Sequence, residues 1–333
     1  MLKFFLFVVT SIDFAYVNFN SYLDLPKSLY SLKTLVQQCN IDAKIFIADN
    51  SFVSADPLDV VNLSDLCQSL SSPGFHVSYM PSDSNVGFGS ACNKMALMSS
   101  SPTLAFVNCD TCFDRCDPAD FLNMIDLLNF QNTCIVGPRV VGDDGLLHAS
   151  CFSFDPISIL LKPSRHIRRV GTRLKLRIPF YSSFKRRIDR ITYEGMDKTL
   201  PTSVDWVSGC FLLVRRDFFQ LVNGFDERYF LYFEDVDLCR KARQFSKSVA
   251  FDPRTVVIHK ASHQSASRSG VFRSMLFNPV TRYHIFSWIK YCIKWRKDFF
   301  QKLLIVIGSL PASRAHFKTS AGYKLDFSIY KPL

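Results

Sequence analysis

The chain lacks any apolar run long enough to cross a membrane. A spanning helix needs about 20 apolar residues, and the best candidates, residues 4–10 and 303–310, are far shorter. The apolar stretch at 2–9 is also too short for a secretory signal, and Asp13 follows it closely. These absences predict a cytoplasmic protein.

Paired cysteine spacing is also lacking, although the chain has 11 cysteines. Cys109, Cys112 and Cys116 lie close together, but neither a second cluster nor a nearby histidine completes the about four ligands of a zinc site. The pattern favours reduced, half-buried thiols, with structural zinc as a minor alternative.

Glutamate is absent from residues 1–150, which hold 7 Lys/Arg against 15 Asp. Residues 151–333 reverse this balance, with 33 Lys/Arg against 14 Asp/Glu, and 11 of these basic residues fall within 162–190. Such asymmetry predicts that the second half faces an anionic partner, either a membrane surface, a lipid pyrophosphate or nucleic acid. The 162–190 stretch matches no nucleic-acid-binding module, which disfavours the last of these.

What is present describes a globular protein: 333 residues, 48% of them apolar and 21% charged. In the first half, apolar runs alternate with helical patterns, which predicts a doubly wound α/β fold with a mainly parallel sheet flanked by helices. The expected strands are 3–10, 44–48, 75–80 and 103–107, and the expected helices are 25–38 and 85–99. Beyond residue 137 we expect short strands in 138–154 and 204–214, helices at 216–223 and 234–244, and a strand at 249–258.

Polar residues stand where three of these apolar runs stop. Ligands of open α/β sheets bind beyond the carboxyl ends of the strands, and Asp49, Asn85 and Asp110 occupy such ends. Between Asn85 and Asn93, two glycines precede a helix and could let its N-terminus face a phosphate, or could simply make a tight turn.

A carboxylate at a buried strand end needs a partner. Asp110 could therefore hold a divalent cation that neutralises a departing diphosphate, or could be a turn or capping residue. His259, at the end of the 249–258 strand, is either a metal ligand or a core residue.

The segment 204–243 places five carboxylates among aromatic residues: Asp226, Glu227, Glu234, Asp235 and Asp237. Apolar surroundings make a carboxylate a better general base. The alternative is that these acids begin a helix and complement its dipole, which suits Asp237 better than Glu234 and Asp235.

An ordered set of motifs carries a family resemblance over about residues 3–265. The motifs are Asp49-Asn-Ser51, Asn85-x-Gly87-x-Gly89-x3-Asn93, Asn108-x-Asp110, Asp205-Trp206-x-x-Gly209, Gly224-Phe-Asp226-Glu227, Glu234-Asp235-x-Asp237 and His259. Together they resemble the family 2 glycosyltransferases, especially the rhamnosyltransferase-type members that build bacterial surface polysaccharides such as O-antigen and capsule. The resemblance implies a GT-A fold and an inverting transfer of a sugar from a dTDP- or UDP-linked donor to a lipid-linked or oligosaccharide acceptor.

The resemblance also implies roles for individual residues. Asp235 would be the catalytic base, with Glu234 beside it, and Asp110 would bind Mn²⁺ or Mg²⁺ with His259 as a second ligand. The remaining implied contacts are with the donor nucleotide (Asp49, Asn85, Gly87, Asn93, Asn108 and Asp110) and with the acceptor (Trp206 and Gly209).

The chain departs from the family at three points. Cys112 stands where a second acid often follows the metal-binding Asp, and Cys109 replaces the usual preceding Pro. The polar residues that normally end the first strand, expected at 3–10, are replaced by Thr10-Ser11-Ile12-Asp13.

For domain organisation we expect a GT-A catalytic domain at 1–267 and a helical, basic and aromatic C-terminal extension at 268–333. The catalytic domain would consist of a nucleotide-binding half, 1–115, and an acceptor half, 116–267, that carries the basic insertion 162–190. Trp288, Tyr291 and Trp295 among Lys290, Lys294, Arg296 and Lys297 favour attachment to anionic lipid at the cytoplasmic face of the inner membrane.

Two other functions compete with this one. A sugar-nucleotide nucleotidyltransferase would need a Gly-rich loop with a basic residue behind the first strand, and residues 10–24 contain no Gly, Lys or Arg. A non-catalytic protein whose basic half binds a membrane or nucleic acid is the other alternative.

Overall fold

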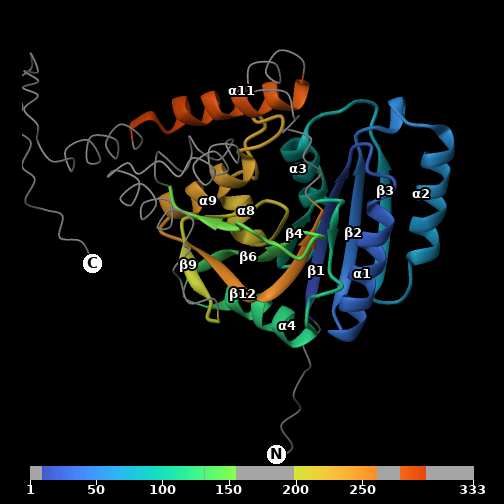
Figure 1. Ribbon diagram of the computed structural model, residues 1–333, viewed down its shortest axis with the longest axis horizontal. Coiled ribbons are helices and arrows are strands. Elements are labelled where there is room, and N and C mark those ends of the chain that lie inside the picture. The colour runs from blue at the N-terminus through green and yellow to red at the C-terminus, as the bar shows by residue number, and fades with distance from the viewer. Residues whose placement is uncertain (1–9, 131, 155–198, 261–277, 298–333) are drawn as a thin grey trace, which may run out of the picture. The chain divides into compact units, whose positions relative to one another are not determined.

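The computed structural model describes residues 10–130, 132–154, 199–260 and 278–297 (Figure 1). The helices of these ranges are α1 (Leu25–Gln38), α2 (Pro57–Leu70), α3 (Phe88–Met98), α4 (Pro118–Asp126), α8 (Arg216–Leu221), α9 (Glu234–Gln244) and α11 (Pro279–Lys294), with 3-10 turns η1 (Phe52–Ser54) and η2 (Leu127–Asn129). The strands are β1 (Ser11–Asn18), β2 (Asp42–Asp49), β3 (Phe75–Pro81), β4 (Thr103–Val107), β5 (Thr111–Cys112), β6 (Thr133–Val141), β7 (Leu147–His148), β8 (Cys151–Phe152), β9 (Thr202–Val204), β10 (Trp206–Val207), β11 (Phe211–Arg215) and β12 (Ser248–His259).

One mixed sheet organises the fold, in the order β3-β2-β1-β4-β11-β6-β12-β5. Strands β1 to β4 are mutually parallel where they pair, β11 lies antiparallel between β4 and β6, and β12 is parallel to β6. Two successive antiparallel pairings restore direction, so β6 and β12 run the same way as β4. The predicted mainly parallel sheet flanked by helices is confirmed.

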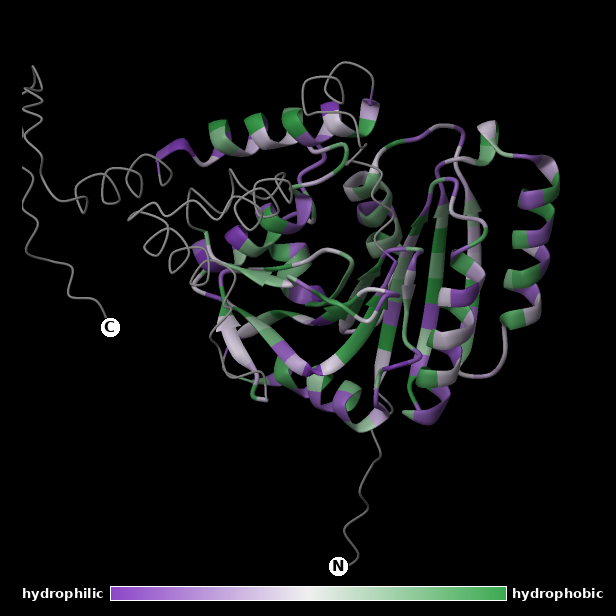
Figure 2. Cartoon of the chain, viewed as in Figure 1, coloured by the Kyte–Doolittle hydropathy of each residue, from purple (hydrophilic) through white to green (hydrophobic). Residues whose placement is uncertain are grey.

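The core lies between this sheet and its helices. All five residues of β4 are buried, and α1 turns a stripe of four leucines and Val36 inward, in the pattern that predicted the helix. Figure 2 shows the hydrophobic colouring along the central strands. Each such aliphatic side chain stabilises the fold by about 1.5–3 kcal/mol when it is fully buried.

The first strand lies later in the chain than the sequence indicated. Residues 3–9 fall outside the described ranges, and the strand that pairs with both β2 and β4 is Ser11–Asn18. Asp13, which looked like a polar strand end, lies inside this strand and is 2% exposed. Its carboxylate accepts hydrogen bonds from the hydroxyls of Ser99 and Ser101, both at 2.6 Å. The assignment of 10–13 to the strand's end was therefore wrong, because buried hydroxyl donors compensate the charge.

Two helices escaped the sequence analysis, α2 and α4. Both begin with the same dipeptide, Asp56-Pro57 and Asp117-Pro118, in which the Asp side chain caps the helix and the Pro occupies its first turn. The Asp accepts from exposed amide donors and Pro lacks an amide hydrogen, so the pair suits a helix start. This signal was available in the sequence.

The chain divides into two compact units, Met1–Lys294 and Trp295–Leu333. Helix α11 belongs to the first unit, although it lies beyond residue 267, where the domain boundary was expected. The basic insertion 162–190 lies outside the described residues. Among the helices in the described ranges, none has the length and hydrophobicity needed to span a bilayer.

Candidate active site

Several polar residues meet at the carboxyl edge of the sheet. Since β2, β4 and β12 run in one direction, their C-terminal ends share an edge, and these ends lead to Asp49, Asn108 and His259. The short strand β5, which follows β4, turns back and pairs with the end of β12, with Thr111 opposite His259. This pairing brings the segment around Asp110 onto His259.

Asp110 and His259 form the most compact part of the site. The carboxylate Oδ1 of Asp110 lies 3.1 Å from Nε2 of His259, and the side chains are 16% and 18% exposed. The Asn108 side-chain nitrogen lies 3.3 Å from the same ring nitrogen. Lys260 donates its amide to the Asp110 carbonyl at 3.2 Å, which fixes the backbone. The two predicted metal ligands are therefore adjacent and partly accessible.

These two side chains fit a divalent cation that also binds a ligand. One carboxylate oxygen and one imidazole nitrogen suit Mn²⁺ and related ions, which need further oxygen ligands. Within the described ranges, no group of three or more His, Cys, Asp or Glu side chains is placed to hold a metal ion. A cation here would thus need oxygens from a diphosphate or water to complete its coordination.

The nearby cysteines do not supply that third ligand. Cys112, in β5, is 6% exposed and Cys109 is 5% exposed. The Cys109 thiol points to the carbonyl of Val17 at 3.2 Å. Burial raises the pKa of both thiols, which disfavours the thiolate that metals bind. All 11 cysteines lie in described ranges and are free, so the zinc alternative finds no support at these residues.

The candidate base stands at the start of α9. Glu234 and Asp235 are 7% and 8% exposed, so they are not ordinary surface charges. Asp235 Oδ2 accepts the Gly209 amide at 2.9 Å, and its Oδ1 accepts the Val236 amide at 2.8 Å. A Cβ on Gly209 would lie 2.9 Å from the Cβ of Asp235, so only glycine permits this approach. Gly209 thereby holds the Asp235 carboxylate in place.

One dipeptide connects the two parts of the site. Next to Gly209, the Cys210 carbonyl accepts the Asn108 amide at 2.9 Å and the Thr111 hydroxyl at 3.1 Å. The pKa of the Cys210 thiol is raised to about 12, chiefly by burial and further by the charges of Asp110 and Asp235. The dipeptide thus contacts the Asp235 carboxylate through one residue and the segment that precedes and follows Asp110 through the next.

Asp49 is organised more tightly than its expected role in base binding requires. It is 0% exposed, and its carboxylate accepts from Asn18 (3.0 Å), Tyr22 (2.8 Å) and Tyr79 (2.6 Å), as well as from the amide and hydroxyl of Ser51. The pKa of Tyr22 is raised to about 12, mainly by burial and also by Asp49. The partners Asn18, Tyr22 and Tyr79 were missed, because they come from the end of β1, the turn that follows it and the end of β3. A pyrimidine ring that hydrogen-bonded directly to Asp49 would have to displace the hydroxyl of Tyr22 or Tyr79.

The glycine before α3, Gly87, packs against another part of the chain. A Cβ on Gly87, whose φ is +85°, would lie 2.5 Å from the Phe230 carbonyl, and that carbonyl already accepts the Phe88 amide at 3.0 Å. Asn85 accepts from the Gly87 amide at 3.0 Å and from the Asn50 side chain at 3.1 Å. The close approach expected of Gly87 is therefore to the loop before α9, which is the tight-turn alternative.

Asn93 has a similar structural task. Its amide nitrogen donates to the Phe225 carbonyl and its oxygen accepts the Phe225 amide, both at 2.9 Å. The same nitrogen reaches Glu227 at 3.0 Å. Both polar ends of Asn93 are thus bound to the 225–227 loop, and its expected nucleotide contact has no support in this arrangement.

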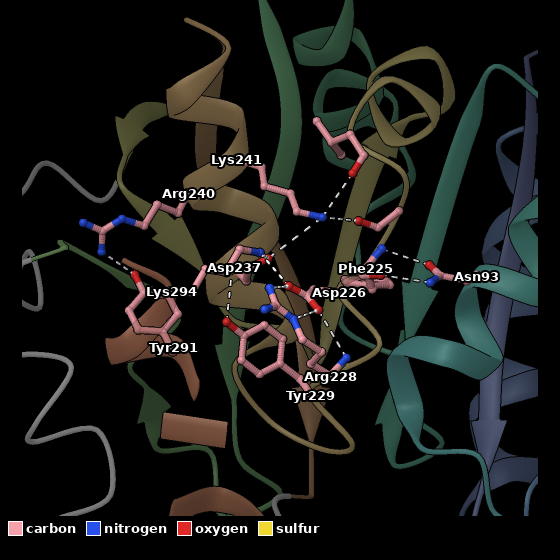
Figure 3. A network of polar contacts seen from close by, with 12 residues as sticks. Asn93, Phe225, Asp226, Arg228, Tyr229, Asp237, Arg240, Lys241, Tyr291 and Lys294 are labelled. Atoms are coloured by element: carbon pink, nitrogen blue, oxygen red, sulfur yellow. Dashed lines mark hydrogen bonds and ion pairs between the residues drawn. The ribbon is translucent and has the colours of Figure 1, made fainter. Parts of the chain in front are cut away.

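The five acidic residues of 226–237 divide into separate roles (Figure 3). Asp226 pairs with Arg228 at 2.6 Å and with Lys294 at 2.7 Å, while Asp237 accepts from Lys294 at 2.7 Å. Burial alone would raise the pKa of Asp226, but the hydrogen bonds from Arg228 and Lys294 hold it well below its usual range. With Glu227 on Asn93, this leaves Glu234 and Asp235 as the catalytic candidates.

Trp206 is buried beside the site. Its ring stacks on Phe152 with centroids 4.0 Å apart, its indole nitrogen donates to the Ser153 carbonyl at 3.3 Å, and it is 1% exposed. It supports the β8–β10 pair that leads into Gly209. Because the Trp206 side chain is buried, its expected effect on the acceptor would have to be indirect, through the position of the β8–β10 pair.

Comparison with known protein families finds none that matches this chain. Over 95 residues, 28% of its length, the chain is 37% identical to the rhamnosyltransferase WbbL of Escherichia coli K12, and these residues span 33% of that protein. Over 62 residues it is 45% identical to an N-acetylglucosaminyl-diphospho-decaprenol L-rhamnosyltransferase of Mycobacterium tuberculosis, covering 19% of the chain and 20% of the relative. The matches thus span a third or less of either relative, and they confirm the resemblance to rhamnosyltransferases over these segments.

Among solved structures, GalNAc-T7 with UDP, GalNAc and Mn²⁺ matches with a TM-score of 0.52 and 12% sequence identity. The match covers 76% of this chain and 44% of that one. At this identity the likeness shows the fold alone, and it confirms the predicted GT-A architecture.

Proposed function

We propose that this protein is an inverting, metal-assisted glycosyltransferase that moves a sugar, rhamnose in the first instance, from a nucleotide diphosphate to a lipid-linked acceptor. The observation that carries the proposal is the Gly209-Cys210 dipeptide, which holds the base at one residue and the cation-side segment at the next. The rhamnosyltransferase matches support the sugar, and the lipid-linked substrate named for the mycobacterial relative supports the acceptor class.

Asp110 and His259 would hold Mn²⁺ or Mg²⁺, and the bound cation would supply positive charge to stabilise the departing diphosphate. Asp235 accepts the proton of the acceptor hydroxyl while that oxygen forms a bond to the anomeric carbon. The bond from this carbon to the diphosphate oxygen breaks on the opposite face, so the configuration inverts. The amides of Gly209 and Val236 fix the Asp235 carboxylate in place for this step.

Contacts with the donor nucleotide are part of the proposal. The side chains of Tyr22 and Tyr79, whose hydroxyls donate to the Asp49 carboxylate, would contact the pyrimidine ring. Asp49 would then act on the nucleotide indirectly, by holding these two tyrosines in place. Asn108, which lies on His259, stands on the diphosphate side.

A donor screen tests this function. The purified chain would be incubated with dTDP-rhamnose, UDP-hexoses and GDP-mannose, with Mn²⁺ or EDTA, and the released nucleotide would be measured. We expect release from one pyrimidine donor that EDTA abolishes and a polyprenyl-diphosphate acceptor accelerates. Turnover that survives EDTA would exclude the cation role, and synthesis of a sugar nucleotide from a triphosphate would establish the nucleotidyltransferase alternative instead.

Attachment to a membrane surface at the cytoplasmic face is proposed with a revised set of residues. Three of those that predicted it are used internally: Tyr291 is 0% exposed, and Lys290 and Lys294 donate to the 226–237 segment. The outward side of α11 instead carries Phe286, Ile289 and Ile293 at helical spacing, with exposures of 58%, 40% and 58%. Figure 2 shows hydrophobic and hydrophilic residues alternating along this helix.

Vesicle flotation distinguishes these faces. We expect the chain to float with anionic vesicles and to lose most of this binding when Phe286 and Ile293 are both changed to Ser, because about 0.8 kcal/mol is lost for each buried CH₂ group. Binding that is unchanged in this double variant would exclude the α11 face.

A further inference from the structure

Helix α11 contacts the turn before Glu234 and Asp235 through residues spaced three or four apart along the helix. Lys290 donates to the Arg228 carbonyl at 2.6 Å, and Ser287 donates to the Leu231 carbonyl at 2.8 Å. About one helical turn before Ser287, the ring of Tyr283 lies 4.5 Å from the ring of Phe230. A helix from late in the chain thus satisfies the backbone of a turn that is about 60 residues away in sequence.

This turn has an unfavourable backbone conformation. Tyr232 and Phe233 have φ angles of +69° and +70°, in the left-handed region that bulky residues avoid. They immediately precede Glu234. The His284 ring lies 4.7 Å from Tyr232 and 5.6 Å from Phe233, and Tyr291 lies 5.4 Å from Phe233. Such a conformation persists only when the surroundings enforce it, and here α11 supplies much of those surroundings.

Lys294 closes the segment at both ends (Figure 3). Its ammonium donates to Asp226, which precedes the turn, and to Asp237, which follows it, at 2.7 Å in both cases. Asp237 is 0% exposed, so its charge needs a compensating cation. Glu234 and Asp235 lie between the two carboxylates that Lys294 joins. Without this ammonium, Arg228 would still pair with Asp226 and Lys241 would remain 3.9 Å from Asp237. No single cation would then join the two carboxylates across the turn, and we expect the intervening turn to relax.

We infer that α11 acts as a splint, meaning that it holds residues 228–233, the turn before Glu234 and Asp235, in a fixed conformation. Within it, Lys294 is a positioning residue for the proposed base, Asp235. It acts through Asp226 and Asp237, and its effect is to keep the Asp235 carboxylate aligned with the acceptor hydroxyl. The inference rests on the proposed function for its kinetic consequence, but the mechanical coupling of α11 to the turn is independent of the reaction.

The kinetic test replaces Lys294 with Met in the full chain. We expect kcat for transfer to fall about 10²-fold, as for a base displaced by about 1 Å, while the KM for the donor stays within about twofold. Lys294→Arg should recover most of kcat, since it keeps the charge. Arg282→Met removes a charge from an exposed position of the same helix and should leave both constants unchanged. Unchanged kcat in Lys294→Met, or donor KM rising in parallel with falling kcat, would overturn the inference.

Hydrogen exchange tests the splint without any turnover. In Lys294→Met, amides of residues 228–237 should exchange at least tenfold faster than in Arg282→Met, with the β1–β4 amides unaffected. If Lys294→Met does not fold, Ser287→Ala removes one contact with the turn and should show the same local change to a smaller degree. Equal exchange in the Ser287 and Arg282 variants would overturn the splint. A wild-type chain that transfers no sugar would exclude the proposed function alone, because the exchange result decides the splint separately.

Discussion

The two sides of the candidate site are built in different ways. The cation side, Asp110 and His259, rests on strand ends that pair directly with each other, and its side chains are 16% and 18% exposed. The base side, Glu234 and Asp235, is more deeply buried and follows a turn that α11 holds from outside the sheet. In the proposed mechanism, the sheet would therefore hold the charge at the leaving group, whereas the position of the general base would depend on a helix from late in the chain.

The sharpest way to break the comparison is to remove the base. Asp235→Asn keeps the size of the side chain and an oxygen that can accept from the Gly209 amide. The new side-chain amide, however, cannot accept the proton of the acceptor hydroxyl. We expect kcat to fall by about 10²–10⁴-fold, the contribution typical of a positioned general base. Initial rates of transfer with a saturating donor measure the loss.

Asp65→Asn provides a matched control, because it makes the same change on an exposed position of α2. Full turnover in Asp235→Asn would remove Asp235 from the mechanism. If kcat fell further in Glu234→Gln than in Asp235→Asn, the general base would be Glu234.

The cation side should respond differently. His259→Ala removes one of two protein ligands, so we expect activity at limiting Mn²⁺ to fall about 10- to 100-fold and to recover partly at high Mn²⁺. Titration of Mn²⁺ with a fixed donor concentration measures the shift. An unchanged metal dependence would mean that His259 only hydrogen-bonds Asp110.

The strand-built side could be predicted from the sequence for a physical reason. Apolar runs mark strands, parallel strands share an edge, and polar residues that follow them must meet there, as Asp110 and His259 do. The β12 end and the strand β4 were located closely because β-branched and aromatic runs stop at polar residues. The exception is β1, where Asp13 imitated a strand end although its partners Ser99 and Ser101 lie far along the chain.

The helix-built side could be predicted only in part. The acids among aromatics pointed to the right segment, but their division into ion pairs and a base depends on Lys294, which no local pattern connects to Asp226 or Asp237. Lys294 instead looked like part of a membrane-facing basic set. The same limit applies to Asn93, whose two bonds to Phe225 span a separation that no periodicity encodes.

A smaller perturbation tests the link between the two sides. In Gly209→Ala the new Cβ would lie 3.0 Å from Asp235 Oδ2, so the carboxylate must shift by a few tenths of an ångström. We expect kcat to fall about tenfold while the Mn²⁺ dependence is retained, because misplaced catalytic groups lose rate steeply.

Gly145→Ala serves as the comparison for this prediction. Gly145 has a φ of +75° but open space around it, so the substitution strains the backbone of the β6–β7 turn without bringing a new atom against Asp235. It should lower thermal stability without lowering kcat. Equal kcat values in the two variants would show that Gly209 has no part in placing the base.

The smallest expected effect concerns the contribution of Asp226 to the free energy of unfolding at low pH. Hydrogen bonds from Arg228 and Lys294 hold the pKa of Asp226 below its usual range despite the opposing effect of burial. A lowered folded-state pKa means that this stabilisation is complete above the unfolded value of about 4 and is lost as the pH falls through the folded value. Asp226→Asn should therefore cost about 1 kcal/mol at pH 7, and the difference from wild type should shrink towards pH 2. Urea unfolding at pH 7, 4 and 2.5 measures it.

Asp217 offers the matched surface pair for that measurement, since Arg215 lowers its pKa too but its side chain is 64% exposed. Solvent screens an exposed pair, so Asp217→Asn should cost well under about 1 kcal/mol at any of these pH values. If the two variants showed the same pH dependence, the carboxylate that Lys294 joins to Asp237 would be no better organised than a surface charge. The base side would then owe its order to the aromatic contacts of α11, and to the Ser287 hydroxyl, more than to its buried ion pairs.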